Sequence, residues 1–215
     1  MKMITTSSSS KVAASGDSDA QFRLGYRLAH GRRLGRRWRE AASWFARSAA
    51  QGHPRAQFHL GTCYDFGHGV AKSYTRAMRY YAKAASQGHA AAQYNLALGY
   101  RDGQGVAQDS KRAVFWFRKA AKQGDAEALR DLGVCLHEGL GARRDDKGAV
   151  RCYFRAARQG DQKAAFNLGQ CYRYGHGVVV NVGKAAFWFR RAAALGHRGA
   201  KSALRSLGRS KGRTG

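Results

Sequence analysis

Residues 92–124 read AQYNLALGYRDGQGVAQDSKRAVFWFRKAAKQG, and variants of this stretch recur along the chain every 36 residues. Glycine and leucine mark the period: Gly52, Gly88, Gly124, Gly160 and Gly196; Leu24, Leu60, Leu96, Leu132, Leu168 and Leu204. No insertion or deletion interrupts it. Such a period is typical of solenoids, in which each repeat buries its apolar face against its neighbours. We therefore divide the chain into five repeats (17–52, 53–88, 89–124, 125–160 and 161–196) and a capping half repeat, 197–210.

Each repeat predicts two helices joined by a glycine-rich turn. The first helix follows a capping column made of Asp17, His53, His89, Asp125, Asp161 and His197. Asp is a good N-cap because its carboxylate accepts from free backbone N–H groups. The turn, Gly103-Gln104-Gly105-Val106 in the third repeat, offers glycine where a helix end needs positive φ. The second helix places aromatic residues opposite small ones, which predicts interlocked helices, eleven in all.

These columns resemble the Sel1-like repeat (SLR) family, a relative of the tetratricopeptide repeat. Residues 92–124 match its pattern best, through Leu96-x-x-x-Tyr100, Gly103-x-Gly105-Val106 and Trp116-Phe117. The likeness extends over residues 17–208. It implies an all-α, right-handed α-solenoid with a concave face. Members of the family are mostly adaptors and scaffolds, so it also implies a non-enzymatic role in protein–protein interaction.

Charge and the chain ends set further expectations. Lys and Arg number 39 against 13 acidic residues, a formal charge of +26, which favours acidic partners without defining a fold. Segment 1–16 is rich in Ser and Thr and is predicted to be disordered, and 211–215 is a basic tail. No apolar run reaches the roughly 18 residues of a membrane helix. We expect an intracellular, soluble monomer that is not secreted, and leave organelle targeting and nuclear import open.

No constellation of residues indicates catalysis, a metal or a cofactor. The histidines have no i, i+4 metal spacing with a third ligand, and the Gly67-His68-Gly69 turn lacks the strand that precedes a phosphate loop. Cys63, Cys135 and Cys171 share one column, a repeat apart, and are expected to be buried thiols. In cysteine-rich members of the Sel1-like repeat family, which this sequence resembles, a Cys pair bridges consecutive repeats. The matching positions here hold Ala85 with Gln93 and Ala121 with Leu129, so the bridge is absent.

The leading hypothesis is an adaptor that binds a protein segment in the concave groove. The resemblance places the first helices on that face, and their exposed columns vary in chemistry from repeat to repeat, as a peptide-reading groove would. The predicted groove residues are Arg23, Tyr26, His59, Thr62, Phe66, Asn95, Leu98, Asp102, Asp131, Val134, Glu138, Asn167, Gln170 and Tyr174. Free drift of surface positions is the alternative explanation.

Acidic residues are scarce enough for three of these positions to be singled out. Asp102, Asp131 and Glu138 are interpreted as an acidic patch that selects a basic or polar segment. The aromatic column that contains Phe58, Tyr94 and Phe166 precedes the groove and is a candidate for apolar anchors. The competing interpretation is that the acids only offset the neighbouring Arg101, Arg130 and Arg173.

A second hypothesis is polyanion binding, to RNA or an RNA–protein assembly. The first repeat replaces the usual turn by a cluster of Arg32, Arg33, Arg36, Arg37 and Arg39, which the family pattern does not require. Basic clusters of this density are candidates for nucleic-acid contact or nuclear import. Compositional drift toward Arg explains the cluster equally well. The sequence does not identify the protein partner.

Overall fold

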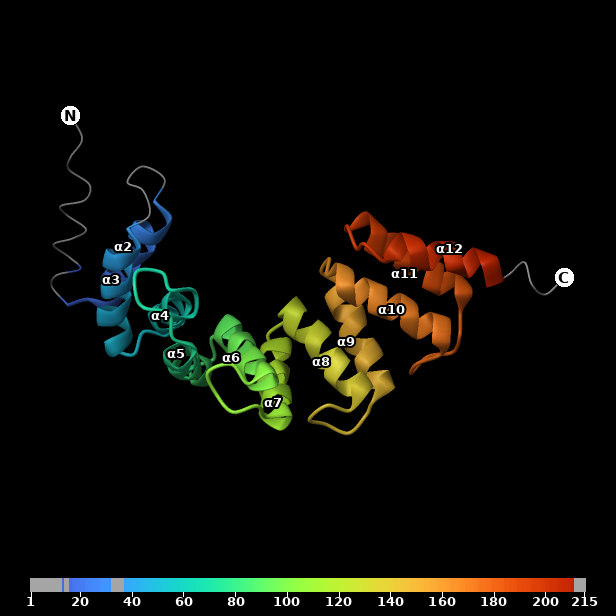
Figure 1. Cartoon of the computed structure of the whole chain (residues 1–215), viewed down its shortest axis with the longest axis horizontal. Coiled ribbons are helices and arrows are strands. Elements are labelled where there is room, and N and C mark those ends of the chain that lie inside the picture. Colours follow the sequence, from blue (N-terminus) through green and yellow to red (C-terminus); the bar gives the residue numbers. More distant parts are fainter. Residues whose placement is uncertain (1–12, 14–15, 32–36, 211–215) are drawn as a thin grey trace, which may run out of the picture. The chain divides into compact units, whose positions relative to one another are not determined.

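The computed structural model describes residues 13, 16–31 and 37–210. This part of the chain contains eleven helices and no strand (Figure 1). They are α2 (Ser18–His30), α3 (Trp38–Ala50), α4 (Pro54–Phe66), α5 (Tyr74–Ser86), α6 (Ala90–Asp102), α7 (Ser110–Lys122), α8 (Ala126–Glu138), α9 (Asp146–Arg158), α10 (Gln162–Tyr174), α11 (Val182–Ala194) and α12 (Ala200–Ser210). The predicted all-α solenoid of helical pairs is confirmed. The tail 211–215, nearly all of segment 1–16 and Arg32, Arg33 and Arg36 lie outside the described residues.

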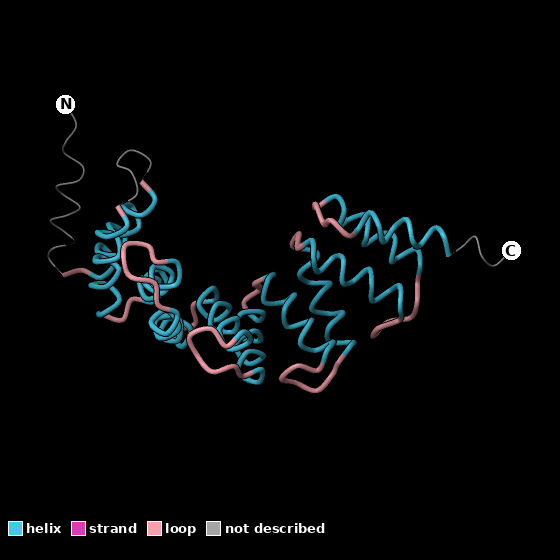
Figure 2. The backbone as a smooth tube through the Cα atoms, in the orientation of Figure 1, coloured by secondary structure: helices cyan, strands magenta, loops and turns pink. Residues whose placement is uncertain are grey.

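The chain divides into two compact modules at Asp109, between the two helices of the third repeat. We call residues 1–109 the N-terminal module and 110–215 the C-terminal module. In each, every helix packs on the helix that follows it, so that helical pairs stack on one another (Figure 2). The N-terminal module contains α2–α6, and the C-terminal module contains α7–α12.

The capping column starts the first helices as predicted. The carboxylates of Asp125 and Asp161 accept from the backbone N–H three residues on, at 2.8 and 2.7 Å. His53 and His89 do the same with Nδ1, each at 3.2 Å. A ring nitrogen accepts only when it carries no proton, so these two caps require Nδ1 to be unprotonated.

In four of the five repeats an aromatic ring of the second helix packs on a glycine of the first helix; the third repeat has Ala97 in the glycine position. A Cβ atom on Gly61 would lie 2.8 Å from the Tyr81 ring, and one on Gly169 would lie 2.6 Å from the Phe189 ring. Both rings are fully buried. The glycine column of the first helix therefore makes room for the large aromatic residue of the second, and alanines fill the remaining space.

A second set of glycines sets the distance between repeats. Gly177, in the turn after α10, has φ +70°, and a Cβ there would lie 2.4 Å from the Asp146 carbonyl carbon. Asp146 begins α9, the second helix of the preceding repeat. Gly69, Gly105 and Gly141 meet the starts of α3, α5 and α7 in the same way. Each turn thus approaches the preceding helical pair as closely as its backbone allows.

We expect Gly177→Ala to destabilise the protein more than Gly160→Ala. Both positions have positive φ, which costs a side chain about 1–2 kcal/mol. Gly160 (φ +94°) has no atom within 4 Å of a new Cβ, whereas Gly177 faces backbone at 2.4 Å. The overlap should add about 1–3 kcal/mol. Urea unfolding of the two variants measures the difference, and equal midpoints would contradict this account of repeat spacing.

Candidate functional site

The predicted groove residues fall on five first helices, in two modules. Arg23 and Tyr26 lie on α2; His59, Thr62 and Phe66 on α4; Asn95, Leu98 and Asp102 on α6; Asp131, Val134 and Glu138 on α8; Asn167, Gln170 and Tyr174 on α10. The first eight belong to the N-terminal module and the last six to the C-terminal module. Each set is described within its own module.

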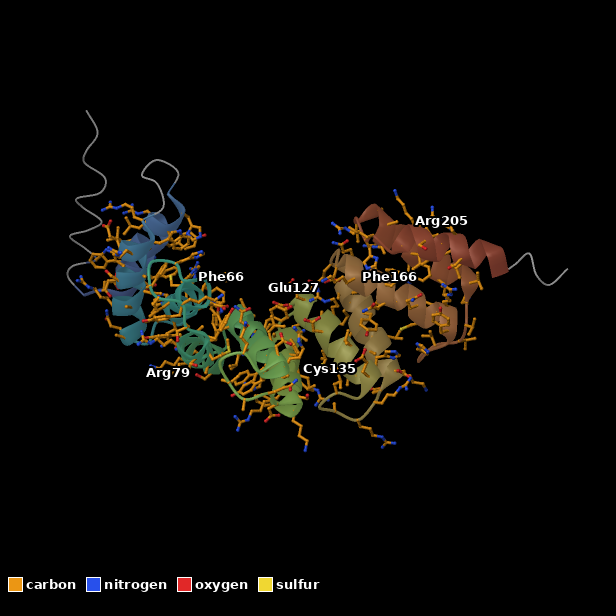
Figure 3. All side chains as sticks on the ribbon, viewed as in Figure 1. Phe66, Arg79, Glu127, Cys135, Phe166 and Arg205 are labelled. Atoms are coloured by element: carbon orange, nitrogen blue, oxygen red, sulfur yellow. The ribbon has the colours of Figure 1, made fainter. Side chains whose placement is uncertain are left out.

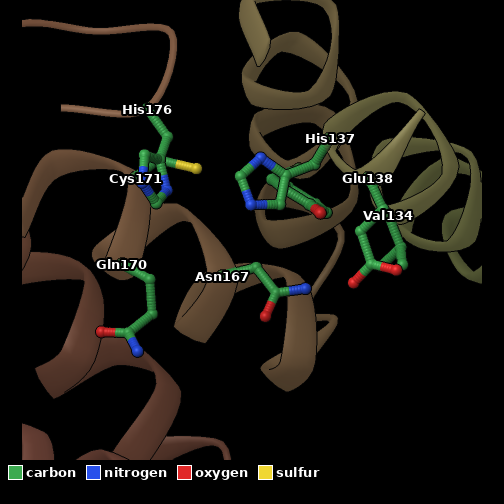
Figure 4. A pocket seen from close by; sticks show the side chains of 8 residues that line it. Val134, His137, Glu138, Asn167, Gln170, Cys171 and His176 are labelled. Atoms are coloured by element: carbon green, nitrogen blue, oxygen red, sulfur yellow. The ribbon is translucent and has the colours of Figure 1, made fainter. Parts of the chain in front are cut away.

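In the C-terminal module, part of the predicted set surrounds a pocket of about 170 Å³ between α8 and α10 (Figure 4). Val134, Glu138, Asn167 and Gln170 line it, as do four residues outside the prediction: His137, Tyr153, Cys171 and His176. Figure 4 shows His137 and Glu138 of α8 across from Asn167 of α10. Two adjacent repeats therefore contribute to one cavity.

A hydrogen bond to an acid holds one wall of this pocket. His137 Nδ1 lies 2.6 Å from Asp146 Oδ1, and the His137 and His176 rings lie 4.9 Å apart. Asp146 also accepts from Arg144 at 2.9 Å. The hydrogen bond from Arg144 above all, and that from His137, lower the pKa of Asp146. Asp146 therefore stays ionised and fixes the His137 ring.

The thiol of Cys171 and the hydroxyl of Tyr153, which line the pocket, stay protonated at neutral pH. Burial raises the pKa of the Cys171 thiol to about 11, and burial also raises the pKa of the Tyr153 hydroxyl. Neither group is then an activated nucleophile. Gln170 contributes a buried Oε1 that accepts no hydrogen bond from the described residues. A buried acceptor without a donor is costly, so this atom favours a ligand that donates.

Two members of the predicted acidic patch are engaged within the protein. The Asp131 side chain, 12 % exposed, accepts from Arg130 at 2.8 Å. Asp102 accepts two hydrogen bonds from Arg101, at 2.7 and 2.8 Å, and these lower its pKa. Glu138 is exposed and forms no ion pair among the described residues. Asp102 and Asp131 thus pair with neighbouring arginines, as the competing interpretation expects, and Glu138 lines a pocket.

Arg173 takes another role than the one expected for it. It donates to Ser206 Oγ at 2.9 Å and covers the Tyr174 ring at 5.0 Å. It therefore ties α10 to the capping helix α12 rather than offsetting an acid.

The candidate aromatic anchors also serve the fold. Phe58 stacks on the His89 cap at 4.6 Å between ring centroids. Phe166, labelled in Figure 3, stacks on the His197 ring at 4.2 Å. Arg130 occupies the same column and donates to Asp161 at 2.9 Å, the cap of the next repeat. This column links consecutive repeats, and it is not available as a row of anchors for a partner.

His59, a predicted groove residue, lies inside an aromatic cluster. Its ring stacks on Phe45 at 5.2 Å and meets Tyr26 edge-on at 5.5 Å. Burial first, and then the charges of His30, His89 and Arg55, lower the pKa of His59 to about 4. The ring therefore stays neutral and packs as an apolar group at physiological pH.

The Arg-rich turn lies mostly outside the described residues. Of its five arginines, Arg37 and Arg39 are described, and both are exposed at the start of α3. Arg37 forms an ion pair with Glu40. Within the described ranges no group of three His, Cys, Asp or Glu residues could hold a metal ion. Each described helix is too short or too polar to cross a bilayer.

Comparison with known proteins identifies the repeat. The sequence profile of the Sel1 repeat matches residues 18–53, 54–89, 90–125, 126–161 and 162–197. The chain belongs to the Sel1 repeat family. Sel1 repeat proteins are generally non-catalytic scaffolds that bind protein partners. The predicted family is confirmed.

Several solved structures are similar to this Sel1 repeat protein. The crystal structure of c5321, a protective antigen of uropathogenic Escherichia coli strains, has 36 % identity and a TM-score of 0.89 over 94 % of this chain and 43 % of its own. A Sel1 repeat protein from Oxalobacter formigenes has 32 % identity and a TM-score of 0.84 over 90 % of this chain and 80 % of its own. Cysteine-rich protein B of Helicobacter pylori has 25 % identity and a TM-score of 0.50 over 62 % of this chain and 96 % of its own. No curated protein sequence matches. The chain thus spans less than half the length of the E. coli protein.

We expect thiol counting on denatured, unreduced protein to find four thiols, because the structure joins no two of the cysteines. In the native protein at mildly alkaline pH, Cys152 should react first. It is half-buried, and although burial raises its pKa, the charges of Arg155, Arg151 and Arg118 oppose that rise. No such charge among the described residues acts on Cys63, whose pKa burial raises to about 12. A count of two or zero in the denatured protein would overturn the assignment.

We expect stability to fall as pH falls from about 6.5 to 4. His59 has an ordinary pKa of 6.5 and a folded pKa of about 4, so the unfolded chain takes up its proton first. The loss should be about 3 kcal/mol for this residue and should level off below pH 4. Thermal melts of wild type and His59→Gln test this. An equally steep pH dependence in the variant would contradict it.

Proposed function

We propose that this Sel1 repeat protein is a non-enzymatic adaptor that binds a polypeptide partner along its first helices, and that the pocket between α8 and α10 receives a Lys or Arg side chain of that partner. One observation carries the proposal. Val134 and Glu138 of one repeat and Asn167 and Gln170 of the next, all positions of the predicted groove, line the same cavity.

The size of the pocket favours a side chain over a free small molecule. Small-molecule sites usually enclose about 300–1,000 Å³. This cavity has about 170 Å³, which suits one extended side chain. A polypeptide would then lie across α8 and α10 and insert one residue, with the rest of its contacts on the surrounding surface.

The polar groups of the pocket favour a donor. The Glu138 carboxylate accepts only, and the buried Gln170 Oε1 has no donor among the described residues. Lys and Arg side chains donate and do not accept, and hydrogen bonds between charged groups are stronger than neutral ones. The Nδ1 atom of His137 is already hydrogen-bonded to Asp146, so this residue lines the pocket without offering that atom to a ligand.

An exposed ring supplies an apolar contact outside the pocket. Tyr174, at the end of α10, is 54 % exposed. It belongs to the predicted groove and, unlike Phe166, it does not stack on the cap of the following repeat. Aromatic residues of this kind dominate the energy of many interfaces.

A selection of random displayed peptides on the immobilised full chain tests the proposal. We expect enriched sequences to share a Lys or Arg at one position. Synthetic peptides of that sequence should bind Glu138→Gln about tenfold more weakly than wild type, because a charge-assisted hydrogen bond is lost. Fluorescence polarisation measures both affinities, and replacing the shared Lys or Arg by norleucine should have the same effect.

Glu127→Gln is the matched control. Glu127 is an exposed acid on the same helix, α8, and does not line the pocket (Figure 3). Equal weakening by both substitutions would show that general charge, not the pocket, drives binding. Enriched peptides without a shared cation would overturn the choice of ligand.

A further inference from the structure

The second helices of the C-terminal module carry most of its basic charge. Helices α7, α9 and α11 contain twelve Lys and Arg and a single acid, Asp146. All twelve basic side chains are exposed: Lys111, Arg112, Arg118, Lys119, Lys122, Lys147, Arg151, Arg155, Arg158, Lys184, Arg190 and Arg191. The first helices α8 and α10 hold three basic and three acidic residues between them. Among α7–α11 the basic charge is thus concentrated on the second helices, and α12 adds Lys201 and Arg205.

Three exposed phenylalanine rings lie on these same helices. Phe115 on α7, Phe154 on α9 and Phe187 on α11 are 51 %, 43 % and 53 % exposed. Phe154 and Phe187 both contact the edge of Trp188, at 5.8 and 5.2 Å between centroids, so α9 and α11 form one aromatic surface. Each of the second helices α7, α9 and α11 thus exposes one phenylalanine among its basic residues.

Cations border the rings. Lys119 lies 5.6 Å from the Phe115 ring, Arg158 lies 6.0 Å from Phe154, and Arg191 lies 5.8 Å from Trp188. The guanidinium of Arg155 reaches from α9 to the Ala121 carbonyl oxygen of α7 at 3.5 Å, which joins the α7 part of the surface to the rest. Rings alternate with positive charge across all three helices.

We propose that this face, made by Phe115, Phe154, Phe187 and the basic residues around them, binds single-stranded nucleic acid. Unpaired bases stack on aromatic side chains without sequence preference, and Lys and Arg neutralise the phosphates between them. The face is distinct from the Arg32–Arg39 cluster and from the pocket between α8 and α10.

The arrangement favours a nucleic acid strand over an anionic membrane. A membrane-bound surface needs a continuous apolar stripe that enters the lipid. Here Lys119 borders Phe115, Arg158 borders Phe154 and Arg191 borders Trp188. The other large exposed apolar side chain described on these helices is Val182, the first residue of α11. A strand that offers a flat base and a negative charge at each step matches this alternation.

Titration of fluorescent oligouridylate with the full chain at several salt concentrations tests the proposal. We expect binding at about 0.15 M salt. Replacing Phe115, Phe154 and Phe187 by Ala should weaken it about fivefold or more for each ring, with an unchanged salt slope. Replacing Arg118, Arg158 and Arg191 by Ser should reduce the slope of log affinity against log salt by about 2.

Matched controls separate this face from general charge. Tyr174→Ala removes an exposed ring from α10, and Lys163, Lys201 and Arg205 to Ser remove three exposed charges from α10 and α12. Both control variants should bind oligouridylate with the affinity of wild type. The charge control should change the slope of log affinity against log salt less than the Arg118, Arg158 and Arg191 variant does. Equal losses in test and control variants would overturn the proposal, as would binding that the ring variant leaves unchanged. Circular dichroism confirms that the variants fold.

Three competitors decide the class of ligand. Duplex RNA, polyglutamate and phosphatidylserine vesicles should each bind more weakly than oligouridylate. Duplex RNA that binds as strongly as oligouridylate would exclude stacking of bases on the rings. Polyglutamate that competes equally well would show that charge by itself explains the binding. Tighter binding to the vesicles would assign the face to membranes. Glu138→Gln should leave oligouridylate binding unchanged, so failure here and failure of the pocket as a peptide site are independent results.

Discussion

Contacts between residues 31 positions apart hold consecutive repeats together, and every other feature depends on them. Phe22 stacks on His53, Phe58 on His89, Arg130 bonds to Asp161, and Phe166 stacks on His197. The turn glycines use the same interval: Gly69 meets Trp38, Gly105 meets Tyr74, Gly141 meets Ser110 and Gly177 meets Asp146. One contact secures the first helix to the next cap, and the other secures the turn to the preceding second helix. A strict 36-residue period preserves both.

The contact between a first helix and the cap of the next repeat is made by different residue types, but always by residues 31 positions apart. A phenylalanine meets a histidine cap at three junctions, and an arginine meets an aspartate cap at a fourth. The residues substitute in pairs, because a cap that accepts a backbone hydrogen bond through a neutral ring suits an aromatic neighbour, and a carboxylate suits a guanidinium. Stability of such a chain is a sum over neighbouring repeats, so each junction can be tuned separately. Burial above all lowers the pKa of His89 and of His197, so the junctions that use these two rings weaken on acidification.

Buried glutamines take the place of the Cys pair in the cysteine-rich members that the sequence resembles. Gln93 Nε2 donates to the Ala85 carbonyl oxygen at 3.1 Å, and Gln57 makes the same bond to Ala49 at 3.3 Å. The bond joins the end of one repeat to the first helix of the next. A satisfied buried amide therefore links the repeats here without a disulfide.

The sequence predicts the helices, their caps and the turns well, because the repeat presents each signal several times. It predicts side-chain partners poorly, because pairs such as Arg130 with Asp161 or Phe166 with His197 lie in different repeats and look like independent surface residues. Four pocket residues lie in the predicted groove columns, while His137 was not singled out. The other repeats hold Ala29, Asp65, Arg101 and Arg173 in its column, so the sequence gives no single departure that would have marked it.

Helix α9 serves both proposed sites, and their charges keep the ligands apart. Tyr153 lines the pocket, and the next residue, Phe154, is exposed among the basic side chains of the second helices. A basic peptide is repelled by the twelve cations of α7, α9 and α11 and meets the carboxylate of Glu138 in the pocket. A nucleic acid strand is attracted by the same cations and repelled by the carboxylate of Glu138. Because successive residues of one rigid helix face the two ligands, both can be bound at once, and the module can hold a basic protein segment and a nucleic acid strand in a fixed relation without either competing for the other's surface.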